Sequence, residues 1–178
     1  MYEKTEKVFL MERVQHYQTE IDSCLELVTS SADETFDFGH KLGSLLKAGD
    51  VVALIGDFGT GKTWLAKGIA AGLKVPNHEY VNSPAFDLIH EYLGELHVYH
   101  MDFYRIDKLS IEDYSWLEEY LYGEGVCIIE WADKFIDHLI DKYLKVELFH
   151  TEDFEKRELR ITAVGDDRYY EIIEGLKR

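Results

Sequence analysis

The chain has 178 residues, of which 46% are hydrophobic and 30% are charged, a composition typical of one globular domain and not of a disordered or fibrous protein. Its 19 basic and 35 acidic side chains give a formal charge of −16, which repels the phosphate backbone of nucleic acids and argues against direct nucleic-acid binding. Two cysteines without a Cys-x-x-Cys pair indicate neither a disulfide framework nor a thiolate metal site.

The first residues, Met1-Tyr-Glu-Lys-Thr-Glu-Lys, lack the apolar centre of a secretory signal. The chain also lacks any run of about 18 apolar residues, so we expect a cytoplasmic protein without membrane association. Residues 1–23 carry apolar side chains at helical spacing among charges, which predicts an N-terminal arm or short helix of unknown function. The rest of the chain, 24–178, is expected to form a single domain.

The first half of this domain alternates strand and helix patterns. A strand is predicted at 25–29, and Ser31 and Glu34 have the spacing of a capping box that begins a helix through Leu46. Residues 51–55, Val-Val-Ala-Leu-Ile, are continuously apolar, as expected of a strand covered on both faces. A helix from Lys62 to about Leu73 follows.

The second half continues this alternation with shorter elements. Strands are predicted at 86–90, 96–101, 126–130, 143–149 and 158–164, the last two as a hairpin. Helices are predicted at 110–122, 134–140 and 169–176. Together these elements predict an α/β fold, a three-layer domain with a mixed, mainly parallel sheet.

A phosphate-binding motif lies between the apolar strand at 51–55 and the helix that follows it. Gly56-Asp-Phe-Gly-Thr-Gly-Lys-Thr63 fits G-x-x-x-x-G-K-[ST] at every fixed position, and a chance match is on the order of one in a hundred. Glycines allow successive N–H groups to point at phosphate oxygens, and the helix dipole adds favourable potential. The residues expected to bind the nucleotide here are Gly56, Asp57, Phe58, Gly59, Thr60, Gly61, Lys62, Thr63 and Trp64.

Within this P-loop, Lys62 is expected to reach the β- and γ-phosphates, and Thr63 to place its hydroxyl on Mg²⁺. A P-loop also requires a carboxylate at the tip of a neighbouring strand, to hold the metal or its water. Two apolar runs end in a carboxylate residue, one at Asp102 and the other at Glu130. Either carboxylate alone could merely cap a helix or solvate a strand end, but the P-loop favours a role in the site.

Other polar residues near these strand ends leave alternatives open. Trp131 follows Glu130 and is either a wall of the site or a core residue, and Arg105 either supports charge near the phosphates or pairs with Asp102 or Asp107. His97 and His100 are three residues apart on a predicted strand, hence on opposite faces, which argues against a shared metal and favours ordinary polar positions.

Four motifs in this order resemble the TsaE family, the small bacterial ATPases of tRNA threonylcarbamoyladenosine biosynthesis. They are Gly56-Asp-Phe-Gly-Thr-Gly-Lys-Thr63, Asn82-Ser-Pro-Ala85, His100-Met-Asp-Phe-Tyr-Arg105 and Ile129-Glu-Trp131. The resemblance covers roughly residues 24 to 165, and the four motifs together are more specific than the P-loop alone.

This resemblance implies a P-loop NTPase-like fold and a weak intrinsic ATPase that acts with the partner proteins TsaB and TsaD and reaches tRNA only through their complex. It implies ATP and Mg²⁺ as cofactors, with Thr63 and Glu130 as the metal-binding residues. Lys62, Asp102 and Glu130 are the implied catalytic residues, Asp102 ordering water or metal. Thr35 and Arg157 also match positions near the nucleotide in the family.

The chain departs from the family at Ala85, where Ser-Pro-Thr is usual, so the hydroxyl that would sense the γ-phosphate is missing. Two other functions fit a P-loop. A small-molecule kinase requires cations over the transferred phosphoryl group, and the six arginines of this chain do not cluster. An ATP-ordered binding module would turn ATP over only incidentally. A GTPase is disfavoured because no Asn-Lys-x-Asp base-recognition sequence occurs.

Overall fold

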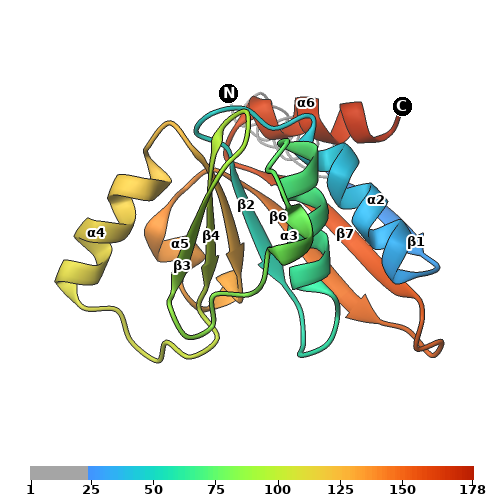
Figure 1. The fold of residues 1–178 in the computed structure, drawn as a ribbon, viewed down its shortest axis with the longest axis horizontal. Helices are drawn as coiled ribbons and strands as arrows, with labels where there is room; N and C mark the ends of the chain where they lie inside the picture. Colours follow the sequence, from blue (N-terminus) through green and yellow to red (C-terminus); the bar gives the residue numbers. More distant parts are fainter. Residues whose placement is uncertain (1–23) are drawn as a thin grey trace, which may run out of the picture.

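A computed structural model describes residues 24–178, which form a seven-stranded sheet of order β1-β7-β6-β2-β5-β4-β3 (Figure 1). The arm or helix predicted for 1–23 lies outside the described residues. Strands β6, β2, β5 and β4 are parallel to one another, and antiparallel strands complete both edges, so the predicted mixed, mainly parallel sheet is confirmed. The strands are β1 (Cys24–Thr29), β2 (Val51–Ile55), β3 (Ile89–Leu93), β4 (His97–Asp102), β5 (Val126–Glu130), β6 (Tyr143–His150) and β7 (Arg157–Val164).

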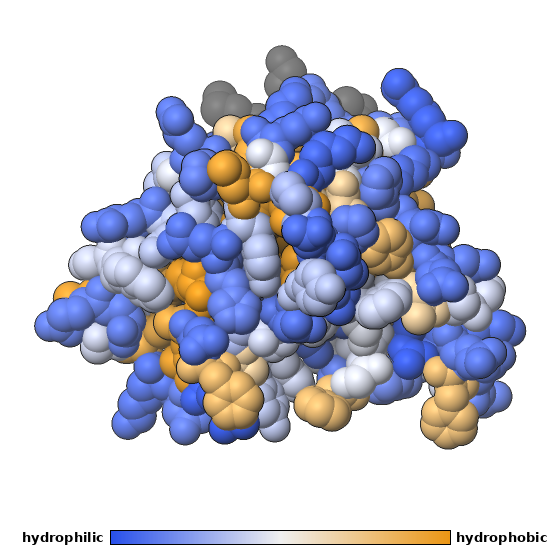
Figure 2. All heavy atoms as spheres, in the orientation of Figure 1, coloured by the Kyte–Doolittle hydropathy of each residue, from blue (hydrophilic) through white to orange (hydrophobic). Residues whose placement is uncertain are grey.

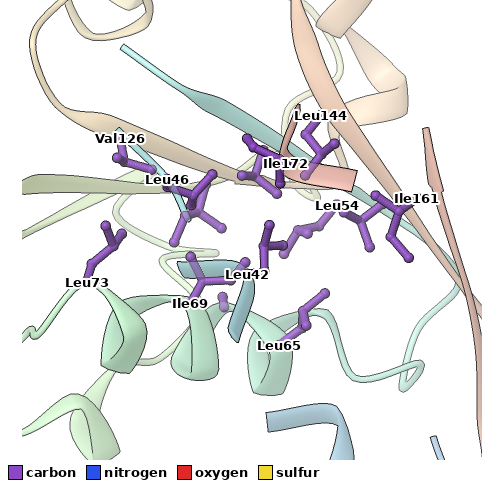
Figure 3. Packing of buried hydrophobic residues seen from close by; sticks show 14 of the residues in the cluster. Leu42, Leu46, Leu54, Leu65, Ile69, Leu73, Val126, Leu144, Ile161 and Ile172 are labelled. Atoms are coloured by element: carbon purple, nitrogen blue, oxygen red, sulfur yellow. The ribbon is translucent and has the colours of Figure 1, made fainter. Parts of the chain in front are cut away.

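Helices cover both faces of this sheet, so the predicted three layers are confirmed. Residues of α2 (Ala32–Gly43), α3 (Lys62–Gly72) and α6 (Asp167–Leu176) pack into the core on one face (Figure 3). Residues of α4 (Ile111–Leu121) and α5 (Ile136–Leu139) pack into the core on the other. Two short 3-10 helices complete the chain, η1 (His78–Tyr80) and η2 (Ala132–Lys134).

The sequence of β2 is continuously apolar because both faces of the strand are buried. Val52 and Leu54 point into the core beneath α2 and α3, where Figure 3 shows Leu54 among Leu42 and Ile69. Val51 and Ala53 point into the core on the opposite face, and these four of the five β2 residues are fully buried. A strand covered on both faces has no solvent-facing positions for polar residues.

Helices α2 and α3 approach each other backbone to backbone. A Cβ atom on Gly43 would lie 2.2 Å from the carbonyl oxygen of Ile69, and one on Gly68 would lie 2.3 Å from that of Phe36. Only glycine allows such an approach. This contact fixes α2 beside α3, the helix that begins at the P-loop.

Several predicted element boundaries are wrong for local reasons. Ser31 caps α2 and accepts from the Glu34 N–H, but the Glu34 carboxylate accepts from Ser30, so the reciprocal half of the predicted capping box is absent. The predicted helix to Leu46 ends at Gly43, where the chain turns with Ser44 as C-cap.

Two other predicted elements are shorter or divided. The strand predicted at 86–90 begins only at Ile89, because a turn after Pro84 places Leu88 in the left-handed region with φ 68°. The helix predicted at 134–140 is divided between η2 and α5 by Phe135, whose φ of −143° is not helical. Among residues 24–178, none of the helices has the length and apolar character required to cross a membrane.

Candidate functional site

The candidate site lies where the parallel strands β2, β5 and β4 end. The P-loop follows β2 directly, Glu130 is the last residue of β5, and Asp102 is the last residue of β4. Strand register places Asp102 opposite Glu130, and Glu130 opposite Leu54 of β2. Ligand sites in open α/β sheets form at the carboxyl ends of strands, which here face the lower edge of the molecule in Figure 1.

The P-loop conformation requires its glycines. Gly56, Gly59 and Gly61 have φ angles of 150°, 80° and 100°, in the region that favours glycine. A Cβ atom on Gly56 would lie 2.5 Å from the carbonyl oxygen of Leu148, on the neighbouring strand β6. Helix α3 begins directly after Gly61, so the N–H groups of its first turn face the loop.

The Lys62 side chain is held inside the P-loop. Its ammonium donates to the carbonyl oxygens of Gly56 at 2.6 Å and Asp57 at 2.9 Å, and lies 4.1 Å from the ring centroid of Trp131. Burial lowers the pKa of Lys62 below its ordinary value, and the carboxylates of Glu130 and Asp102 oppose this shift. The lysine is thereby positioned beside two carboxylates and over an aromatic ring.

Thr63 and Glu130 are in direct contact. The Thr63 hydroxyl donates to Oε2 of Glu130 at 2.9 Å, and Nε2 of His100 lies 2.9 Å from Oε1 of the same carboxylate. Glu130 is 2% exposed and His100 is fully buried. Both oxygens of this buried carboxylate therefore have partners.

The Asp102 carboxylate is also held at both oxygens. Oδ2 accepts a hydrogen bond from the Ser83 hydroxyl, and Oδ1 accepts from the N–H of Tyr104 at 2.8 Å. Asp102 is only 4% exposed. Ser83 belongs to the Ser-Pro-Ala segment, so this segment contacts Asp102 through its serine, and not through position 85.

Two cavities flank the P-loop and meet at Gly61. One, of about 320 Å³, is lined by Lys62, Thr63, Asp102 and Glu130 together with Trp131. The other, of about 250 Å³, lies against the first turn of α2. Its lining residues include Thr35, Thr60, Trp64, Phe154 and Arg157.

Thr35 and Arg157, the two residues that the family resemblance places near the nucleotide, both line this second cavity. They come from different elements, α2 and β7. Thr35 is buried, donates to the Ser31 carbonyl oxygen and lies 2.7 Å from the Thr29 hydroxyl oxygen. Arg157, the first residue of β7, donates through Nε to the Thr60 carbonyl oxygen at 3.1 Å. Its contact with the P-loop follows because β6, which leads into β7, pairs with β2.

Exposed aromatic side chains surround the site. Phe58, Phe86 and Phe154 are 80%, 84% and 89% exposed. Figure 2 shows hydrophobic side chains projecting along the lower edge, where Figure 1 places the P-loop and the loops beside it. The Arg105 guanidinium lies 4.2 Å from the centroid of the Phe86 ring, and neither of its predicted pairings with Asp102 and Asp107 is among the ion pairs of residues 24–178.

Three residues that contact or line the site, His100, Ser83 and Trp131, were not assigned to it from the sequence. His97 and His100 do lie on opposite faces of β4, but His100 contacts Glu130 and is not an ordinary polar position. Ser83 contacts Asp102, and Trp131 lines the cavity with a left-handed φ of 56°. A histidine two residues before a strand-end carboxylate, hence on the same strand face, is the signal that would have found His100.

The strand, P-loop and helix arrangement, with carboxylates at the tips of adjacent parallel strands, places the chain among P-loop NTPase-like α/β proteins. A sequence profile of the family described as "Threonylcarbamoyl adenosine biosynthesis protein TsaE" matches residues 29–159. The chain therefore belongs to the TsaE family, as its motifs predicted.

Individual relatives agree with this assignment. The chain is 41% identical over 151 residues to the tRNA threonylcarbamoyladenosine biosynthesis protein TsaE of Bacillus subtilis, covering 84% of this chain and 92% of that protein. It is 39% identical over 126 residues to the TsaE of Treponema pallidum, covering 70% and 90%. The crystal structure of Bacillus subtilis YdiB superposes with a TM-score of 0.72 at 36% identity, covering 87% of this chain and 95% of that one.

Proposed function

We propose that this chain is a Mg²⁺-dependent ATPase that supports the threonylcarbamoyladenosine modification of tRNA, in the cytoplasm and in a complex with TsaB and TsaD. The observation that carries the proposal is the contact between Thr63 and Glu130 at the mouth of the P-loop. It joins the loop to the tip of the adjacent strand, the arrangement by which P-loop proteins hold a metal-bound triphosphate.

The side chains at this contact suit Mg²⁺. A hydroxyl and a carboxylate are hard oxygen donors, which Mg²⁺ prefers, and Thr63 and Glu130 would hold it. Within residues 24–178 no three His, Cys, Asp or Glu side chains gather as a metal-binding group. Phosphate oxygens of the nucleotide would therefore supply further ligands, as in other nucleotide sites. The ion, when bound, neutralises charge on the phosphates.

The two cavities suggest the direction in which ATP lies. The 320 Å³ cavity contains Lys62, Thr63, Asp102 and Glu130, so we assign it to the triphosphate. The 250 Å³ cavity has Trp64 and Phe154 as aromatic walls, so we assign it to the adenosine, with Thr35 and Arg157 beside it. The P-loop residues Gly56 to Thr63 then lie between the two.

In this arrangement each catalytic residue has a separate task. Lys62 binds the β- and γ-phosphates and stabilises the charge that develops on them. Asp102, whose carboxylate is fixed by Ser83 and the Tyr104 N–H, orients the attacking water. Because Ser83 makes this contact, the loop retains a hydroxyl beside Asp102 although Ala85 lacks one.

The partner proteins are proposed from the family, and the surface supports them. Three exposed phenylalanines around the site form an apolar rim, which is typical of protein interaction surfaces. The charge of −16 disfavours direct contact with tRNA, so the complex would supply that contact.

The deciding experiment combines nucleotide binding with association. Calorimetric titration of the chain with ATP, with Mg²⁺ and with EDTA, should show binding that Mg²⁺ strengthens, and phosphate release should be slow alone. Pull-down with TsaB and TsaD should depend on ATP. Failure to bind Mg·ATP overturns the proposal. ATP-dependent association without turnover would favour the binding module, and phosphoryl transfer to a small molecule would favour the kinase.

A further inference from the structure

His100 occupies a buried position with one polar contact. Its side chain is 1% exposed and that of Glu130 is 3% exposed, and Nε2 lies 2.9 Å from Oε1 of Glu130. The other ring nitrogen, Nδ1, is buried and has no hydrogen-bond partner among residues 24–178. Leaving a buried nitrogen without a partner costs free energy, so an apolar side chain would suit a purely structural position better.

The contact with Glu130 explains a histidine at this position. An ionised carboxylate only accepts hydrogen bonds, so Nε2 carries the proton and donates it. With Oε1 held by His100, Oε2 is directed at the Thr63 hydroxyl, 2.9 Å away. A carboxylate fixed at both oxygens has lost its freedom to rotate about its terminal bond. Since β4 and β5 are hydrogen-bonded neighbours with His100 opposite Ile128, the backbone of His100 is itself held by the sheet beside β5.

We propose that His100 is a positioning residue for the metal site: it fixes the Glu130 carboxylate toward Thr63 and thereby sets the affinity of the nucleotide site for Mg²⁺. The inference rests on the proposed function, because it assigns Glu130 to the metal. Groups that orient metal-binding side chains in this way change metal affinity by about 10- to 100-fold when they are replaced.

Two amide variants of different length test this role. In His100→Gln the side-chain amide can reach the place of Nε2 and donate to Glu130, whereas in His100→Asn it reaches only the place of Nδ1. The affinity for a non-hydrolysable ATP analogue is measured by calorimetry in Mg²⁺ and in EDTA. The Gln variant should keep the wild-type gain in affinity from Mg²⁺, and the Asn variant should lose about tenfold of it. Affinity in EDTA should be the same in both.

Equal dependence on Mg²⁺ in the two variants would overturn the inference. A second measurement needs neither nucleotide nor metal. In the ¹⁵N-labelled wild-type protein, NMR should show a proton on Nε2 of His100. An Nε2 without a proton would also overturn the inference. This spectrum decides the matter if the Asn variant does not fold. If the wild-type protein shows no Mg²⁺-dependent binding at all, the proposed function fails, which is a different result from equal variants.

Discussion

Lys62 is held by the main chain of the loop that it is proposed to serve. Its ammonium donates to two carbonyl oxygens and is 5% exposed as a residue, so the charge is already desolvated and oriented. Replacing Lys62 with alanine should weaken ATP binding about 10- to 100-fold, because a hydrogen bond to a charged group contributes roughly 1.5–3 kcal/mol. Calorimetric titration measures the change.

The control for Lys62→Ala is Lys142→Ala, which removes the same charge at the other end of the parallel strands, directly before β6. The Lys142 side chain is 60% exposed and forms an ion pair with Asp166. Its removal should leave ATP affinity unchanged. Wild-type affinity in Lys62→Ala would contradict the assignment of Lys62 to the phosphates.

Glu130 is predicted to matter more for turnover than for folding. Glu130→Ala should lower Mg²⁺-dependent phosphate release by about tenfold or more, because the metal loses an oriented carboxylate. It also removes the partner of His100, which is fully buried, at about 1–3 kcal/mol, whereas the half-buried Thr63 hydroxyl can turn to water. The melting temperature should therefore fall by roughly 2–12 °C while the chain stays folded. Glu147→Ala, on β6, is the matched carboxylate control. Normal hydrolysis by Glu130→Ala would show that the metal assignment is wrong.

Asp102 is predicted to act on hydrolysis and not on binding. Asp102→Asn keeps an oxygen that can accept from the Tyr104 N–H, but removes the charge that would orient and deprotonate water. Single-turnover hydrolysis should slow by about 100-fold, within the range of general-base effects, at an unchanged ATP dissociation constant. Asp87→Asn, at a side chain 72% exposed, should change neither quantity. Unchanged turnover in Asp102→Asn would reduce Asp102 to a structural residue.

The contact of α2 with α3 joins the fold to the site. A Cβ atom on Gly68 would meet backbone atoms of α2, the Phe36 carbonyl oxygen at 2.3 Å and the Gly39 Cα at 3.0 Å. Backbone cannot move aside as a side chain can. Gly68→Ala should therefore destabilise the protein by about 1–3 kcal/mol, and lower its melting temperature by about 2–12 °C.

Gly68→Ala should also weaken nucleotide binding, because α2 carries Thr35 and α3 carries Thr63. The matched control is Gly175→Ala in α6, whose Cβ atom would meet only the flexible end of Leu45, at 3.0 Å from Cδ1. Alanine is the better helix former by about 1 kcal/mol, so this variant should melt at the wild-type temperature or above it. Equal melting of the two variants would contradict the close packing of α2 on α3.

Elements were predictable from the sequence where a local pattern determines them. The buried run of β2, the P-loop glycines and the start of α3 agree with the structure because apolar continuity and special φ angles are encoded at those residues. The strand predicted at 86–90 was wrong at its beginning, since the turn after Pro84 is fixed by backbone hydrogen bonds to Pro84. No sequence pattern likewise indicated that Phe135 divides the helix predicted at 134–140 into η2 and α5.

Contacts between strands that lie far apart in the sequence were not predictable from it. The sequence indicated Glu130 and Asp102 as candidates, and the pairing of β5 with β2 and β4 brings them together. No sequence pattern predicted that the β6–β7 hairpin lies beside β2. This position brings Nε2 of His150 to 3.1 Å from the Phe58 carbonyl oxygen, and lets Nε of Arg157 donate to the Thr60 carbonyl oxygen. Arg157 was found only through resemblance for this reason.

The net charge of −16 disfavours binding of tRNA by the isolated chain. With 35 acidic and 19 basic side chains, the chain repels a polyanion at long range, and only a local basic surface would overcome this. At a physiological ionic strength of about 0.15 M, a gel-shift assay should therefore detect no binding of tRNA by the isolated chain. The same tRNA should shift with the TsaB and TsaD complex as positive control. A tight binary complex would contradict the prediction, and would mean that tRNA reaches this chain without the partners.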